Sequence, residues 1–407
     1  MTNILWGILG IVTLFVIAFI LSNNKKSISI RTVLGGLAIQ VLFGFIVLKW
    51  EVGRQAFQSV TNTVQNVVDY ANAGTAFLFG SLADPNQATG FIFAFKVLTL
   101  IIFFSALISV LYYLGIMQWV IRIIGGGLSK ILGTSKAESM SAAANIFVGQ
   151  TEAPLVVKPY IKNMTKSELF AVMTGGLASV AGSVLFGYAA LGIPLEYLLA
   201  ASFMAAPGGL IMAKMLVPET DKPETLDGFK MENDEDAANV IDAAAKGAST
   251  GLQLALNVGA MLLAFIALIA LLNGILGGIG GLLGVKNVSL ELLLGYLFAP
   301  LAFVIGVPWE EALQAGSFIG QKVIVNEFVA YSSFAPEIAN LSEKTVAVIS
   351  FALCGFANLS SMAILLGGLG GLAPSRRQDI ARLGIRAIVA GTLANLLSAA
   401  IAGMFIL

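Results

Sequence analysis

Runs of about twenty apolar residues recur along the chain, and they constrain its fold more than any other feature. A helix of about 20 residues crosses the hydrocarbon core of a bilayer, which is about 30 Å thick. Of the 407 residues, 57% are hydrophobic and only 11% are charged, which excludes a soluble enzyme and a disordered protein. The sequence therefore predicts an all-α polytopic membrane protein. Eight membrane-spanning helices are predicted, over residues 3–21, 33–48, 91–117, 169–190, 197–216, 252–275, 346–369 and 387–407.

Lysine and arginine are distributed unevenly between the loops that join these spans. If the N-terminus lies outside, seventeen of the 23 lysines and arginines fall on the inner side, against four outside and two within membrane segments. Cytoplasmic loops of membrane proteins carry such an excess of positive charge. The distribution therefore predicts that both termini lie on the outer side of the membrane.

The sequence lacks histidine and has a single cysteine, Cys354. The chain therefore has no imidazole base, no histidine metal ligand and no Ser-His-Asp triad. An internal disulfide and a CxxC redox pair are excluded as well. Basic and acidic residues are equal in number, at 23 each, so no overall positive field favours nucleic acid. These observations argue against an enzyme and against a nucleic-acid partner.

Two further stretches, residues 138–160 and 311–333, have apolar flanks around a polar, turn-like centre. The first centre contains Gly149, Gln150, Thr151, Glu152 and Pro154, and the second contains Asn326 and Glu327. Irregular backbone at membrane depth persists only where protein or a water-filled cavity satisfies its polar groups. The charge distribution also requires each stretch to enter and leave the membrane on the same side. We therefore predict two re-entrant hairpins, and the alternative is a pair of ordinary extramembrane loops.

The spans that follow the two hairpins resemble each other, with GGLASVAGSV at residues 175–184 and CGFANLSSMA at 354–363. Aligning Gly176 with Gly355 pairs Ser179 with Asn358. Each half of the chain thus contains a hairpin, an interrupted span and a further span, and the two hairpins enter from opposite sides. This order predicts an inverted-topology repeat with a solute site near the bilayer midplane. Chance similarity among small residues is the alternative for the residue pairing alone.

Polar side chains of the hairpins and interrupted spans supply groups for holding a small polar solute. Broken helices expose free N–H groups at one end and free carbonyls at the other. Neutral donors and acceptors come from Gln150, Thr151, Asn358 and Ser361. Glu152 and Glu327 add strong acceptors, and a carboxylate retained in the membrane indicates a functional site. For the serines, hydrogen bonding to their own helix backbone is an equal alternative.

Two other segments have architectural patterns. Residues 52–73 place apolar side chains at helical spacing among polar ones, which indicates a helix that lies in the membrane interface or packs between subunits. Residues 219–246 form a long and predominantly acidic loop. We interpret this loop as a solvated cytoplasmic linker.

Four motifs together resemble the concentrative nucleoside transporter family, and the similarity extends from end to end of the chain. They are GQTEAP at residues 149–154, NEFVAY at 326–331, CGFANLSS at 354–361 and AASFMAAPGGL at 200–210. The resemblance implies eight transmembrane helices, two opposed re-entrant hairpins and interfacial helices, assembled as a homotrimer in the bacterial cytoplasmic membrane with the termini on the periplasmic side. It also implies a division into a scaffold (1–117), a first transport repeat (118–216), an acidic linker (217–250), a scaffold span (251–285) and a second transport repeat (286–407).

The resemblance also assigns roles to individual residues. Gly149, Gln150, Thr151 and Glu152 of the first hairpin would lie near the nucleobase, with Val184 and Phe356 as apolar walls. Glu327, Asn358 and Ser361 would bind the ribose hydroxyls. A sodium site would use the side chains of Asn145 and Ser179 with the carbonyls of Val148 and Val180. Oxygen ligands of these kinds suit a hard monovalent cation.

The favoured function is sodium-driven symport of a nucleoside such as uridine, with sodium as coupling ion, membrane lipid as surroundings and no other cofactor. Proton coupling through Glu152 or Glu327 is an alternative, because a buried carboxylate can carry a proton. A coupled transporter of another small polar solute is a second alternative. A channel would need a continuous polar pore, whereas the polar residues here cluster at one depth. An intramembrane protease would need paired aspartates, a histidine-assisted serine or a metal site, and the sequence supplies none of these.

Overall fold

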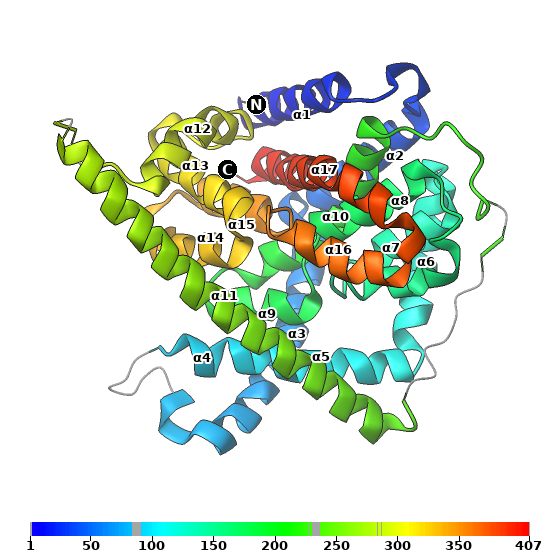
Figure 1. Ribbon diagram of the computed structural model, residues 1–407, viewed down its shortest axis with the longest axis horizontal. Coiled ribbons are helices and arrows are strands. Elements are labelled where there is room, and N and C mark those ends of the chain that lie inside the picture. The colour runs from blue at the N-terminus through cyan, green and yellow to red at the C-terminus, as the bar shows by residue number, and fades with distance from the viewer. Residues whose placement is uncertain are drawn as a thin grey trace.

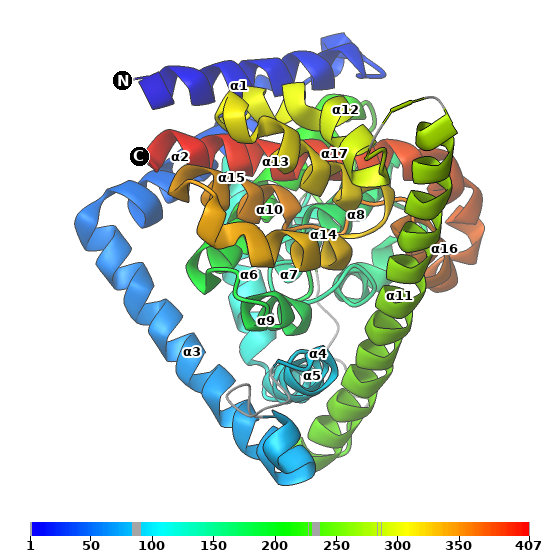
Figure 2. The same cartoon turned by 90° about the vertical axis from the view of Figure 1, so that its left-hand side faces the viewer.

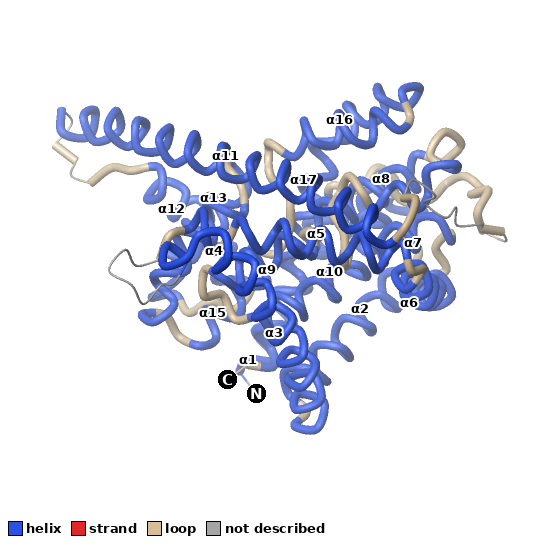
Figure 3. The backbone as a smooth tube through the Cα atoms, turned by 90° about the horizontal axis from the view of Figure 1, so that it is seen from below, coloured by secondary structure: helices blue, strands red, loops and turns tan. Residues whose placement is uncertain are grey.

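The computed structural model describes residues 2–83, 91–226, 228–229, 237–282, 284–285 and 287–406, and these residues form helices and loops without strands (Figure 3). The α-helices of this described part, in chain order, are α1 Thr2–Ile20, α2 Ile30–Gly44, α3 Glu51–Phe79, α4 Phe93–Lys96, α5 Leu98–Tyr113, α6 Ile116–Leu132, α7 Lys136–Ala144, α8 Lys166–Ala178, α9 Gly182–Ala190, α10 Leu195–Leu216, α11 Val240–Leu282, α12 Leu290–Val304, α13 Trp309–Ile324, α14 Glu327–Phe334, α15 Glu343–Leu353, α16 Ser361–Leu372 and α17 Arg377–Phe405. Short 3-10 or π-helical pieces cover Lys25–Ser27, Phe45–Lys49, Gly80–Ala83, Ala153–Tyr160, Ala335–Asn340 and Pro374–Arg376.

Seven helical segments of the described chain are long and apolar enough to cross a membrane. They are Asn3–Ile20, Ile30–Lys49, Phe93–Tyr113, Lys166–Ala190, Leu195–Leu216, Val240–Leu282 and Pro374–Phe405. Each overlaps one of the eight predicted spans, so seven of those predictions are confirmed as helical segments. The remaining one, over 346–369, is divided between α15 and α16.

Two spans are interrupted at the positions where small and polar residues were noted in the sequence. The helices α8 and α9 are separated at residues 179–181, and α15 and α16 are separated at 354–360. These interruptions are called the first break and the second break below. At each break the preceding helix ends with carbonyls that have no partner within that helix. Groups from other segments donate hydrogen bonds to these carbonyls, as described below.

The two predicted hairpin regions both contain a reversal of the chain direction. In the first, α7 ends before a turn at 145–152 and the 3-10 helix Ala153–Tyr160 follows. In the second, α13 is followed by α14 after only two residues, with Asn326 capping α14 by accepting a hydrogen bond from the Val329 N–H at 2.9 Å. The arrangement is consistent with two re-entrant hairpins. The sequence did not predict α12, which meets α13 at a bend of 117°; its apolar run of 15 residues is too short for a crossing helix.

The base of the first hairpin is held by a buried ion pair. Lys214 near the end of α10 lies 2.7 Å from the carboxylate of Glu138 in α7. Ser135 and Glu138 also form a capping box at the start of α7. Reciprocal caps of this kind satisfy free N–H groups of the first helical turn. The charged pair therefore joins the first hairpin to a neighbouring span.

Two long helices, α3 and α11, border one side of the molecule. In Figure 2, α3 and α11 form two edges that converge beside α4 and α5, while the hairpins and broken spans pack above them. Helix α3 confirms the predicted helix at 52–73, with its buried positions on one face. Large apolar side chains of α11 are exposed, including Leu263 at 76% and Leu271 at 61%. This surface therefore suits lipid or another protein copy.

Hydrogen bonds between distant segments define two ends of the molecule. At one end Asn3 donates to the Ile406 carbonyl at 3.2 Å, so both termini lie together, as Figure 1 also shows. At the other end Arg386 donates to the Leu21 carbonyl and Arg376 donates to the Met164 carbonyl. The predicted acidic linker falls partly outside the described residues, since 227 and 230–236 are not among them. Its last part, 240–250, is helical and belongs to α11, so the linker is shorter than predicted.

Candidate functional site

A cavity of about 120 Å³ lies between the two hairpins, the two breaks and helix α11. Every residue that the sequence analysis assigned to solute binding lines it: Gly149, Gln150, Thr151, Glu152, Val184, Glu327, Phe356, Asn358 and Ser361. Residues from the two halves of the chain, up to 212 positions apart, thus meet at one place. Ligand pockets for drug-sized molecules are typically about 300–1,000 Å³, so the walls must separate to admit a larger solute.

Glu327, the first residue of α14, is the principal acceptor of this cavity. Its side chain is buried and its carboxylate accepts hydrogen bonds from the Tyr188 hydroxyl at 3.1 Å and from the Asn358 amide at 3.0 Å. The N-terminal position in α14 adds free N–H groups and a favourable helix dipole. A carboxylate has about four lone-pair sites, so it can accept further donors from a ligand.

Asn358 organises the chain between α15 and α16. Its side-chain oxygen accepts hydrogen bonds from the Ser360 hydroxyl at 2.7 Å and the Ser361 N–H at 2.9 Å. The Ser361 hydroxyl donates to the Phe356 carbonyl. This last bond agrees with the backbone-bonding alternative for the serines, although the hydroxyl oxygen still has acceptor capacity.

The first hairpin presents its turn to the same cavity. Gln150 is 5% exposed, and its side-chain oxygen is buried without a hydrogen-bond partner in the described structure. A buried amide without a partner is costly unless a ligand or water satisfies it. Glu152 is exposed by contrast, and Thr151 is half-buried. Helix α16 approaches this turn closely, because a Cβ added to Gly368 would lie 2.7 Å from the Thr151 methyl carbon.

The residues predicted as cation ligands gather where the first hairpin meets the first break. Asn145 follows α7, is 1% exposed, and has a side-chain oxygen with no partner among the described residues. A Cβ added to Gly176 of α8 would lie 3.7 Å from that oxygen. Ser179 is the C-cap of α8, and its hydroxyl donates to the Gly175 carbonyl at 3.0 Å. This junction thus contains an unpartnered amide oxygen, a hydroxyl oxygen and the carbonyls of a broken helix, which are ligand types that fit a hard cation.

A backbone hydrogen bond also joins the first hairpin to the first break. The N–H of Gly182, at the start of α9, donates to the Phe147 carbonyl at 3.0 Å. The neighbouring residues Val148 and Val180 were predicted to contribute carbonyls, and both are buried. The hairpin turn and the first break therefore form one unit.

Several lining residues were missed by the sequence analysis. The cavity is also lined by Ala181, Leu254, Val258, Met261, Leu262, Asn326, Phe328, Ser360 and Ile364. Four of these come from α11, where a spacing of four, seven and eight residues places them on one helical face. That face was a detectable signal, but it is indistinguishable from an ordinary packing face. Tyr188, the donor to Glu327, is an apolar-flanked tyrosine that gives no signal in a single sequence.

The arrangement suits binding of a compact solute with both hydroxyl groups and an apolar ring. A carboxylate and amides can hold hydroxyls, while Val184 and Phe356 supply apolar walls. Serines in the cavity have no histidine to activate them, because the chain contains none. The site therefore has the chemistry of binding without that of covalent catalysis.

Comparison with known protein families gives three matches that together cover most of the chain. Residues 197–403 match the model described as Na+ dependent nucleoside transporter C-terminus, and residues 9–82 match its N-terminus counterpart. Residues 94–195 match a model described as nucleoside recognition.

Individual relatives agree. YutK of Bacillus subtilis, described as an uncharacterized transporter, is 66% identical over 99% of this chain and 100% of its own length. The nucleoside permease NupC of Helicobacter pylori is 53% identical over 99% of this chain and 98% of its own length. A solved structure of CNTnw in an inward-facing substrate-bound state is 59% identical, covers 99% of this chain and 98% of its own, and superposes with a TM-score of 0.94. The chain is therefore a multi-pass membrane transporter that belongs to the Na+-dependent concentrative nucleoside transporter family.

Proposed function

We propose that the protein imports nucleosides such as uridine, driven by a sodium gradient, through alternating access. The single observation that carries this proposal is the convergence of all nine predicted solute-binding residues on one cavity between the two hairpins. The family match and the relation to a nucleoside permease support the solute class. A different polar solute is less favoured because the cavity combines hydroxyl acceptors with apolar walls of ring size.

In this proposal the residues of the second hairpin and the second break hold the sugar. Glu327 accepts ribose hydroxyls, and its bonds from Tyr188 and Asn358 hold the carboxylate in place. Asn358 and Ser361 provide further polar contacts. Charge-assisted hydrogen bonds are about twice as strong as neutral ones, so this carboxylate dominates the binding energy.

The first half of the site holds the base. Gln150 offers an unpartnered amide oxygen, with Thr151 and Glu152 beside it. Val184 and Phe356 cover the faces of the ring. Because Gly149 lies next to these polar side chains on the cavity wall, its backbone can approach the solute closely.

Sodium binds at the first break, to oxygens of Asn145 and Ser179 and to the carbonyls of Val148 and Val180. The unpartnered oxygen of Asn145 supports this assignment. Neutral oxygen ligands carry no proton to exchange, so they favour sodium over proton coupling.

Transport requires the cavity to open to each side in turn. Helix α11 forms one wall, and the hairpins and breaks form the others. We assign residues 1–117 and 251–285 to a scaffold, while residues 118–216 and 286–407 form the moving transport domain. The exposed apolar surface of α11 supports assembly of scaffolds as a homotrimer. The charge distribution supports a bacterial cytoplasmic membrane with both termini on the periplasmic side.

Uptake of labelled uridine into proteoliposomes tests the proposal under an inward sodium gradient, an inward proton gradient, or neither. Intact uridine should accumulate only with sodium, and protein-free vesicles provide the background. Accumulation only with protons would move coupling to a carboxylate. Equilibration without accumulation would indicate a channel, and absence of uptake under every gradient would reject the nucleoside assignment.

A further inference from the structure

One side chain, Asn395 of α17, bonds to both breaks. It is 2% exposed, and its amide nitrogen donates to the Ala178 carbonyl at 2.6 Å and to the Cys354 carbonyl at 2.9 Å. Ala178 is the last residue of α8, and Cys354 directly follows α15. Carbonyls at helix ends lack partners within the helix. The two amide hydrogens of Asn395 therefore satisfy one such carbonyl at each break.

The orientation of Asn395 is fixed by Lys322 of α13. The ammonium group of Lys322, which is 1% exposed, donates to the Asn395 side-chain oxygen at 2.8 Å. Because the ammonium group can only donate, the amide oxygen of Asn395 must face Lys322 and the amide nitrogen must face the two carbonyls. Glu327 of the nucleoside site attracts the same ammonium group electrostatically.

The two breaks also touch directly. The Phe356 N–H donates to the Ser179 carbonyl at 3.1 Å. Gly391, one helical turn before Asn395, packs against both breaks, because a Cβ there would lie 2.9 Å from the Leu177 Cβ and 3.1 Å from the Ala357 Cβ. The backbone at 178–180 is therefore joined to residues 354–358 by hydrogen bonds.

We propose that Asn395, oriented by Lys322, is the positioning residue that couples cation binding at the first break to nucleoside binding at the second. This inference rests on the proposed function, because it needs both sites to be occupied as assigned there. Cation binding at Ser179 and Val180 fixes the end of α8. Through Asn395 and the Ser179–Phe356 bond, the same event fixes Phe356 and Asn358 in the geometry that binds the nucleoside.

Linkage measurements on the purified full-length protein test this coupling. Uridine affinity is measured in sodium chloride and in choline chloride, and the ratio of the two dissociation constants is the coupling factor. Asn395→Asp keeps the side-chain volume and the acceptor for Lys322 but loses both amide hydrogens. We expect the coupling factor to fall by about fivefold or more, within the usual range of coupling between sites. By reciprocity, uridine should enhance sodium affinity less in the same variant.

Thr392→Val on the same helix is the matched control, since its hydroxyl has no hydrogen-bond partner in the part of the chain described. This control should keep the coupling factor within about twofold of wild type. If Asn395→Asp is not monodisperse, the same measurement is made on Asn395→Ser. A serine hydroxyl can donate to only one of the two carbonyls. A folded Asn395 variant with a wild-type coupling factor would overturn the inference. Absence of sodium dependence in the wild type would instead reject the proposed function.

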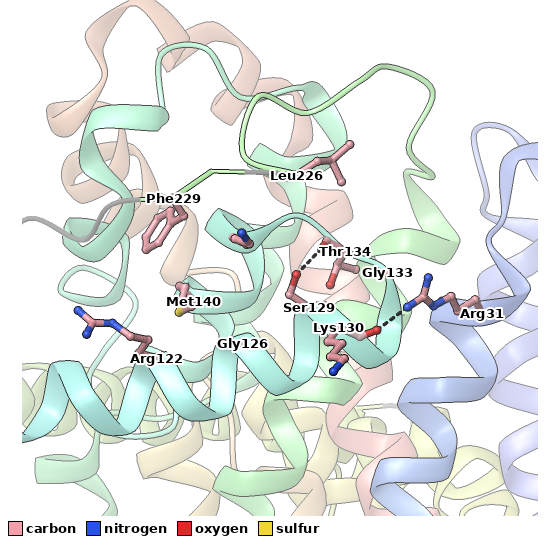
Figure 4. Close-up of a pocket in the computed structure, with 11 residues that line it drawn as sticks. Arg31, Arg122, Gly126, Ser129, Lys130, Gly133, Thr134, Met140, Leu226 and Phe229 are labelled. Atoms are coloured by element: carbon pink, nitrogen blue, oxygen red, sulfur yellow. Dashed lines mark hydrogen bonds between the residues drawn. The ribbon is translucent and has the colours of Figure 1, made fainter.

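A second, independent feature is a basic cavity at the opposite end from the termini. This cavity of about 1,020 Å³ is lined by Arg31, Arg122 and Lys130, and the lining residues that the structure describes include no carboxylate (Figure 4). Arg31 donates to the carbonyls of Lys130 and Ile131, so it is held in place. Arg122 and Lys130, both on α6, have exposed side chains with no ion pair among the described residues.

Helix α6 combines these cations with exposed apolar side chains. Trp119 is 63% exposed, Ile123 is 54% exposed and Ile131 is 51% exposed. This composition is typical of helices in the membrane interface, and basic pockets between membrane helices can bind anionic lipid headgroups. We propose that the cavity holds the phosphate-bearing headgroup of an anionic phospholipid.

Thermal unfolding in nanodiscs tests the lipid site. Replacing zwitterionic lipid by phosphatidylglycerol should raise the unfolding midpoint of wild type more than that of the Arg122→Gln/Lys130→Gln variant. Lys25→Gln/Lys26→Gln is the control, with two exposed cations outside the cavity, and should respond like wild type. An equal shift in wild type and the Arg122/Lys130 variant would overturn the proposal. An equal shift with inorganic phosphate in zwitterionic nanodiscs would also overturn it, by identifying a free anion as the ligand.

Discussion

The two breaks share an architecture but differ in the charge that lies beside them. The first is bordered by the neutral polar groups of Asn145, Gln150 and Ser179, of which two side-chain oxygens have no partner in the described structure. The second is bordered by Lys322 and Glu327, which are both buried. Lys322 donates a hydrogen bond to Asn395, and Glu327 accepts hydrogen bonds from Tyr188 and Asn358.

This difference has a functional consequence. A neutral break with unpartnered oxygens can gain and lose a cation during each transport cycle. The second break instead has Lys322 beside it, and this lysine attracts the buried carboxylate that is proposed to hold the sugar. Burial of an uncompensated charge is costly, so Lys322 offsets part of the cost of burying Glu327. Each of the following predictions tests one side of this contrast.

Glu327→Gln should have the largest effect on transport. The variant loses the strong acceptor for the sugar, and we expect the uridine affinity to fall by about 10- to 100-fold. Uridine binding and uptake measure this change, while size-exclusion chromatography checks assembly. Glu337→Gln is the control, because this carboxylate belongs to the same hairpin region but bonds to Gln314 outside the cavity. Wild-type uptake by Glu327→Gln would remove this residue from the site.

Lys322→Met should reduce stability by about 2–4 kcal/mol, because it leaves Glu327 buried without its compensating charge. The thermal midpoint in detergent measures the loss. The double variant Lys322→Met/Glu327→Gln should be more stable than Lys322→Met alone. Lys344→Met is the control, since Lys344 bonds to Asn3 at the end of the molecule that carries the termini. If the double variant is less stable than Lys322→Met, the two charges do not compensate each other.

Asn145→Ala should weaken cation binding at the first break and leave the second break unchanged. Loss of one oxygen ligand is expected to raise the sodium concentration for half-maximal uptake by about tenfold, equivalent to about 1.4 kcal/mol. Sensitivity to a protonophore should not change. Asn273→Ala, which removes an asparagine bonded to Glu291 outside the cavity, is the control. A change in protonophore sensitivity rather than in sodium dependence would contradict the cation assignment.

The sequence predicted this contrast only in part. Glu327 and Asn358 were identifiable because polar residues inside apolar segments are costly, and the repeat placed them together. Asn145 and the carbonyls of Val148 and Val180 came from family resemblance, and their role stays a prediction. Asn395 and Tyr188 gave no signal, because their function depends on which distant segments their side chains reach. The helix α12 was missed because a short apolar run is ambiguous without knowledge of its packing partner.

Tyr188→Phe should have the smallest effect, because it removes one hydrogen bond to a carboxylate that keeps its bond from Asn358. The hydroxyl is buried and the ring packs between Phe328 and Tyr331, with centroids 4.7 Å and 4.5 Å away, so the phenyl ring of the variant should keep its position. We expect a rise of about 2- to 10-fold in the uridine KM with little change in sodium dependence. Tyr331→Phe is the matched control, since its hydroxyl donates to the Ser350 carbonyl and does not reach the cavity. Equal effects of the two variants on the KM would mean that Tyr188 acts through packing, whereas an effect confined to Tyr188→Phe would show that the carboxylate must be held from both sides to accept the sugar.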